Sequence, residues 1–106
     1  AAVEADMLID EEIKRYLNIE WSKQAVPVIA SIREHCENIR EEVNMLAQKR
    51  LLRGESPSEA IEYATSAIMK KILHDPSVCL RKAGEESNEE LIDAARTLFN
   101  LKNDEE

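Results

Sequence analysis

The sequence predicts an all-α fold: an elongated helical bundle of about four to five helices, two of them long, that dimerises. Apolar residues recur at helical spacing along almost the whole chain. Glycine occurs only twice and proline three times in 106 residues, which is too little punctuation for a fold of many short strands. Apolar residues make up 43% of the chain, which is enough to form the core of one domain.

The charge balance and the hydropathy limit the function further. The chain has 22 acidic and 14 basic residues, and this argues against broad affinity for nucleic acid, which requires Lys and Arg to replace phosphate counterions. No apolar run reaches the roughly 18–20 residues of a membrane span, so we expect no membrane partner. The first residues lack the basic and then apolar pattern of a signal peptide. Two cysteines beside a sizeable core predict free thiols and a cytoplasmic location.

The first predicted helix covers residues 3–25, which contain neither glycine nor proline. Its apolar positions, at helical spacing, are Met7, Ile9, Ile13, Tyr16, Leu17 and Trp21. The helix has no N-terminal cap and the chain has no initiator Met. Either the helix began earlier in a longer protein, or the Met was removed before Ala1.

The second predicted helix begins at Pro27, in the first turn where proline is tolerated, and ends near Arg53, with Gly54 as its C-terminal cap. Its apolar positions are spaced 3, 4, 3, 4 and 3 residues apart, as in a coiled-coil seam: Ile29, Ile32, Cys36, Ile39, Val43 and Leu46. A helix that packs only on its own core would show a wider apolar stripe. Val28, Met45 and Leu51 widen this one only in part.

The length of this helix predicts a second copy. At 1.5 Å per residue, residues 27–53 span roughly 40 Å, whereas a compact globule of 100 residues has a diameter of about 34 Å. The first helix is nearly as long, so the rest of the chain cannot wrap both. We therefore expect a homodimer in which a two-fold partner covers part of the seam.

The third predicted helix starts at Ser56-Pro57-Ser58-Glu59, a capping box with proline at the first helical position. Its inward face consists of aliphatic residues at helical spacing: Ile61, Ala64, Ile68 and Ile72, flanked by Ala60, Ala67 and Leu73. We expect this helix to stop before Pro76, because the residue before a proline avoids the helical conformation.

Two shorter helices are expected after this break. Asp75-Pro76 can open a fourth helix that continues to Arg81. Ser87-Asn88-Glu89-Glu90 is a second capping box and opens the last helix. The inward residues of the last helix are Leu91, Ile92, Ala95, Leu98 and Phe99. Residues 102–106 are expected to form an acidic tail.

Residues that carry chemistry are sparse. Gly54 and Gly84 stand alone, so the glycine-rich fingerprints of nucleotide binding are absent and no cofactor site is expected in this chain. His35 and Cys36 are adjacent and diverge on a helix, and the spacing of the other His and Cys matches no zinc pattern, so no metal site is expected either. Nothing near either cysteine marks it as an activated nucleophile.

Two basic clusters interrupt the acidic surface. The first is Lys49, Arg50 and Arg53, and the second is Lys70, Lys71, Arg81 and Lys82. Favourable placement of cations at helix C-termini is preferred over phosphate binding as their explanation. A structural hydrogen bond is preferred over catalysis for His74, because no second catalytic group is identifiable.

Four segments, in order, carry a family resemblance. Residues 71–81 resemble the Lys-Leu-Leu-His-x-Pro-x-x-x-Leu-Arg signature near the end of glutamyl-tRNA reductases. Residues 27–33 resemble the Pro-x-Ile-x-x-Leu-Arg segment of that family, and residues 37–42 its Glu-x-Ile-Arg-x-Glu stretch. Residues 5–21 resemble the end of its long connecting helix. The departures are mild: Asp6 replaces Glu, Ile32 and Ile72 replace Leu, and Lys70 stands where the family often has Asn.

The resemblance implies that residues 1–26 are the end of the connecting, or spinal, helix, residues 27–101 a helical dimerisation domain and residues 102–106 an acidic tail. The full-length enzyme would reduce glutamyl-tRNA to glutamate-1-semialdehyde with NADPH, in tetrapyrrole (porphyrin) biosynthesis. Its nucleophilic cysteine and its nicotinamide site would lie in other domains. Cys36 and Cys79 do not match the context of that nucleophile, so this fragment would hold no catalytic residue and no cofactor.

The role implied for this chain is therefore architectural. The seam from Ile29 to Leu46 would pack across the two-fold axis or line the bundle beneath it, and Trp21 and Pro27 would fix the bend between spine and bundle. The other residues expected to have a structural role belong to the signature-like segment: Lys71, His74, Pro76, Leu80 and Arg81. The basic clusters would be candidates for touching tRNA. Two alternatives stay open: a stand-alone helical adaptor that grips partner helices, and a small enzyme that uses His74 with nearby carboxylates.

Overall fold

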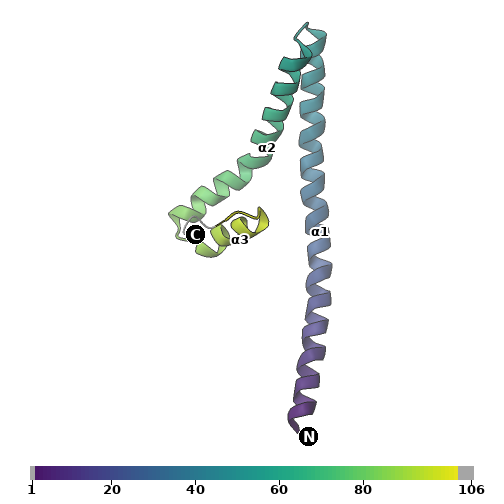
Figure 1. The fold of residues 1–106 in the computed structure, drawn as a ribbon, viewed down its shortest axis with the longest axis vertical. Helices are drawn as coiled ribbons and strands as arrows, with labels where there is room; N and C mark the ends of the chain where they lie inside the picture. The colour runs from purple at the N-terminus through teal and green to yellow at the C-terminus, as the bar shows by residue number, and fades with distance from the viewer. Residues whose placement is uncertain (1, 103–106) are drawn as a thin grey trace. The chain divides into compact units, whose positions relative to one another are not determined.

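The chain folds into helices joined by short loops. The computed structural model describes residues 2–102, with side chains from residue 7 onward. Within this range it contains three helices and no strand: α1 (Ala2–Leu52), α2 (Pro57–Glu85) and α3 (Glu89–Leu98) (Figure 1). The predicted all-α class is confirmed. The predicted acidic tail lies outside the described residues apart from Lys102.

The number of helices was predicted wrongly, because neither internal proline ends a helix. Pro27 lies inside α1, so the two long helices predicted on either side of it are one. Pro76 lies inside α2, so the predicted fourth helix is the continuation of the third. A proline inside a helix leaves the carbonyl four residues earlier without its N–H partner, at a cost of about 3 kcal/mol. Long runs of helix-forming residues on both sides, including all of α1, which has no glycine, outweigh that local cost.

The chain divides into two compact units, Ala1–Asn38 and Ile39–Glu106, which are described separately. The first unit consists of α1 alone. Of its described side chains, those of Glu20 and Cys36 are half-buried and all others are exposed. The apolar residues of this stretch therefore have no cover within the unit.

The second unit contains the C-terminal part of α1 (residues 39–52), α2 and α3. The C-terminal part of α1 and the beginning of α2 run side by side in opposite directions (Figure 1). The buried residues are small: Val43, Ala47, Ala60 and Ala83. Alanine lets the helices approach closely but buries little apolar area, so this core is thin.

All three helices end in the same hydrogen-bonded motif, with a left-handed residue that lets the last carbonyls be satisfied. At the end of α1 this residue is Gly54 (φ 98°), which confirms the predicted cap, and the Glu55 N–H donates to the Arg50 carbonyl at 3.1 Å. Ser87 (φ 55°) and Asn100 (φ 53°) hold the corresponding positions after α2 and α3.

The predicted N-terminal caps are partly confirmed. The Ser56 hydroxyl accepts from the Glu59 N–H at 3.2 Å, as the first capping box requires. The second box was placed one residue too early. Asn88 caps α3 by accepting from the Leu91 N–H at 3.2 Å, because Ser87 is already used in the left-handed turn that ends α2.

Candidate dimer interface

The six residues of the predicted seam fall in different environments. Ile29 and Ile32, in the first unit, are each 59% exposed, and Cys36 is half-buried. In the second unit, Val43 is fully buried, while Ile39 and Leu46 are half-buried. The C-terminal end of the seam is therefore used for packing within the chain, and its N-terminal end is uncovered.

Polar contacts fix the C-terminal part of α1 on α2. Lys71 Nζ lies 2.7 Å from Oε1 of Glu42, the residue that directly precedes the seam residue Val43. Near the loop, the Arg50 guanidinium lies 3.6 Å from the centre of the Tyr63 ring, and its Nη1 lies 3.3 Å from Glu55 Oε1. Sequence reasoning missed the role of Glu42 and Tyr63. The only available signal was their position: Glu42 ends one segment of family resemblance, and Lys71 begins another.

The basic clusters are thus partly used inside the chain. Arg50 of the first cluster and Lys71 of the second have partners within the second unit. Their remaining members are exposed on a chain of net charge -8. The expected helix-end placement holds for Lys49 and Arg50 in α1 and for Lys82 in α2. It is wrong for Lys70 and Lys71, which lie inside α2 because Pro76 does not end that helix.

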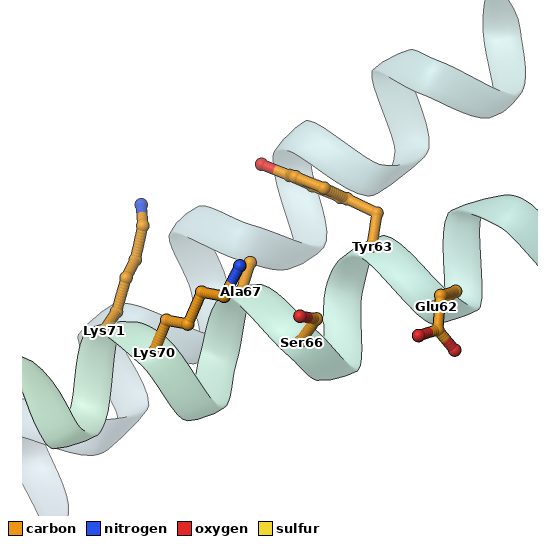
Figure 2. Close-up of a pocket in the computed structure, with 6 residues that line it drawn as sticks. All are labelled: Glu62, Tyr63, Ser66, Ala67, Lys70 and Lys71. Carbon is orange, nitrogen blue, oxygen red and sulfur yellow. The ribbon is translucent and has the colours of Figure 1, made fainter.

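A shallow depression of about 420 Å³ lies on α2. Figure 2 shows that its six lining residues all come from this helix, with Tyr63 and Lys71 pointing toward the facing stretch of α1. Glu62, Ser66 and Lys70 line the rest of it. In the part of the chain that the structure describes, no three His, Cys, Asp or Glu side chains gather as metal ligands would.

The residues of the signature-like segment lie on one helix. Pro76 and Leu80 are half-buried in α2, whereas His74 and Arg81 are exposed. Trp21 is exposed on α1, and with Pro27 it lies inside an uninterrupted helix, so the role expected of the two at a bend stays a prediction. Both cysteines are free thiols.

The described residues do not fit a dinucleotide. Gly54 ends α1 and Gly84 lies inside α2, so neither opens a helix as a phosphate-binding glycine does. The N-termini of α2 and α3 are already occupied by the side chains of Ser56 and Asn88. We therefore assign no NADPH contact and no step of a reduction to them. Across residues 2–102, no helix combines the length and the apolar composition needed to cross a bilayer.

Comparison with known proteins places the chain in a family. The sequence model of the family described as "Glutamyl-tRNAGlu reductase, dimerisation domain" matches residues 4–101. Glutamyl-tRNA reductases of Neisseria meningitidis and Neisseria gonorrhoeae are each 32% identical to the chain over 101 residues, and that of Nitrosococcus oceani is 29% identical. Each alignment covers 95% of this chain but 24% of the relative, so the chain spans about a quarter of the length of these relatives. No solved structure was found to match it.

The family match extends over the four segments that carried the resemblance in the sequence, and the resemblance is confirmed. It also reaches beyond them, through α3, where no signature was recognised. The chain belongs to the family of glutamyl-tRNA reductase dimerisation domains.

Proposed function

We propose that the chain is the dimerisation module of a glutamyl-tRNA reductase and acts by pairing two copies of that enzyme. The observation that carries the proposal is the uncovered end of the seam. Ile29 and Ile32 lie four and three helical turns before Val43 on the same side of α1, yet each is 59% exposed, while Val43 is fully buried. Exposed aliphatic residues that continue a buried face are typical of a surface covered by a partner.

In this proposal the two ends of the seam have different tasks. Ile29, Ile32, Cys36 and Ile39 pack against the second copy. Val43 and Leu46 hold α1 on α2 beneath that contact. The thin core of the second unit supports this division, because a unit that buries mainly alanine gains little stability alone and more by covering its apolar surface.

The proposal extends to the full-length protein. We infer that it is an oxidoreductase of the cytoplasm that uses NADPH to reduce glutamyl-tRNA to glutamate-1-semialdehyde for tetrapyrrole synthesis. Residues 1–26 would be the end of the helix that connects the catalytic domains to the dimerisation domain. The present chain would hold two copies of the enzyme together, and other parts of the protein would supply the hydride donor and the nucleophile.

A charge placed on the uncovered seam tests the dimer. Ile32→Asp puts a carboxylate into the proposed interface, and Ala30→Asp adds the same charge about 160° away around the same exposed helix. We expect light scattering to show a dimer for the wild type and Ala30→Asp, and a folded monomer for Ile32→Asp. An intact Ile32→Asp dimer would refute the seam assignment.

The enzymatic part is tested on the full-length protein. We expect it to oxidise NADPH only when glutamyl-tRNA is supplied, and to release an aldehyde in equal amount. Oxidation of NADPH that does not depend on glutamyl-tRNA would contradict the proposed reaction and leave the dimer proposal in place.

The uncovered stripe also fits the alternative of a helical adaptor, which would grip a helix of another protein. That function requires a chain that stays monomeric when it is concentrated. The wild-type measurement above therefore separates the two functions.

A further inference from the structure

The predicted seam is too small to hold two copies together. A stable homodimer takes about 800 Å² or more of surface from each partner, and an aliphatic side chain offers on the order of 100 Å² of apolar area. Two of the six seam residues are 59% exposed, three are half-buried and Val43 is fully buried. Together they offer roughly 200 Å², so a dimer must cover further apolar surface.

Such a surface lies on α2. Four aliphatic residues at helical spacing follow one side of the helix: Ile61, Ile68, Met69 and Ile72. Ile61 is 63% exposed and Met69 57% exposed, whereas Ile68 and Ile72 are half-buried. These residues and Thr65, which lies between them, are named here the second face.

The second face is built to be buried. Its own positions carry no charge over three turns. Glu62 borders it, since it lies seven residues and so about 20° around the helix from Met69, whereas Glu59, Lys70 and Lys71 occupy other sides of the same stretch. Its single polar side chain is satisfied within the helix, because the Thr65 hydroxyl donates to the Ile61 carbonyl at 3.0 Å. Six turns beyond Ile61 on the same side, Ala83 is buried in the part of α2 next to α3.

We propose that the second face packs against the second face of another copy of this chain, in an antiparallel pair of α2 helices about a two-fold axis. This rests on the proposed function, which it deepens by naming the surface. An axis near residues 66 and 67 sets Ile61 opposite the partner's Ile72. It sets Thr65, whose hydroxyl is bonded within its own helix, opposite the partner's Ile68.

The experiment compares Met69→Glu with Lys70→Glu by sedimentation equilibrium of the 106-residue chain. Both residues are exposed and adjacent on α2, but only Met69 lies on the second face. We expect Met69→Glu to raise the dimer dissociation constant by about 100-fold or more, and Lys70→Glu to change it by less than about fivefold. Circular dichroism checks that each variant is helical.

Cross-linking provides a second readout that does not depend on a destabilising charge. With Cys36 and Cys79 replaced by Ala, which keeps position 36 apolar, Thr65→Cys should give a covalent dimer with a short bismaleimide, and Lys70→Cys should not. If the wild type is dimeric but Met69→Glu keeps its affinity and Thr65→Cys fails to cross-link, the second face is not the interface, although the dimerisation proposal stands. If the wild type is monomeric at high concentration, the dimerisation proposal itself fails.

Discussion

Glu42 and Lys71, 29 positions apart in the sequence, form an ion pair in which Oε1 and Nζ are 2.7 Å apart. Glu42 ends one of the segments that resemble glutamyl-tRNA reductases, and Lys71 begins another. The two segments meet where α1 lies against α2, beside the fully buried Val43. In this part of the molecule, the residues that carry the family resemblance form a packing contact between helices rather than a catalytic site.

Exchanging the two charges tests this contact. Glu42→Lys and Lys71→Glu should each destabilise the chain by no more than about 1 kcal/mol, because the side chains are 60% and 38% exposed and solvent screens the pair. The double variant should recover most of that loss. Urea unfolding at low salt measures this, and a double variant less stable than both single variants would contradict a direct pairing.

The buried seam residue should matter more for stability than its exposed neighbours. Val43→Ala removes two carbon atoms from a fully buried position, and we expect the free energy of unfolding to fall by about 2 kcal/mol. Met45→Ala, at a residue 60% exposed on the same helix, should cost less than about 0.5 kcal/mol. Equal losses in the two variants would show that Val43 is not part of the core.

The left-handed turn after α2 offers a stabilising substitution. Ser87 has a φ of 55°, a conformation that glycine adopts without the steric cost of a Cβ. We expect Ser87→Gly to raise the free energy of unfolding by about 0.5–1 kcal/mol. Asn100→Gly should gain less, because asparagine tolerates the left-handed region better than serine does. A loss of stability in Ser87→Gly would contradict the left-handed conformation assigned to Ser87.

The two prolines in α1 and at the start of α2 should respond in opposite directions. Pro27→Ala restores an N–H that can donate to the Lys23 carbonyl, so we expect greater helicity and a stability gain on the order of 1–3 kcal/mol. Pro57 occupies the first helical position, where its missing N–H costs nothing, so Pro57→Ala should be neutral or slightly destabilising. Circular dichroism during thermal unfolding distinguishes the two. Loss of helicity in Pro27→Ala would indicate that the helix is broken there.

What could be predicted from the sequence was set by local chemistry. The cap at Ser56 and the left-handed turn at Gly54 each depend on a few neighbouring residues, and both were predicted correctly. The effect of Pro27 was predicted wrongly because the rule applied to it is also local. The extent of a helix as long as α1 depends instead on the many helix-forming residues on both sides of Pro27.

The division of the seam could not be predicted in the same way. The spacing from Ile29 to Leu46 is regular, and nothing in it distinguishes Ile32 from Val43. Their difference arises from tertiary packing. Val43 belongs to the unit in which α2 covers part of α1, whereas Ile32 belongs to the other unit, which consists of α1 alone. The second face was overlooked for a related reason: the sequence assigned Ile61, Ile68 and Ile72 to the inward face of this helix, whereas in the structure Ala60 is buried and Ile61 is exposed.

The most direct test of the account is the mass of the wild-type chain in solution, measured by sedimentation equilibrium over a range of concentrations. The chain has a mass of 12.1 kDa. We expect a species of twice that mass at micromolar concentration, which dissociates only on dilution. A single species of 12.1 kDa that persists at millimolar concentration would contradict it.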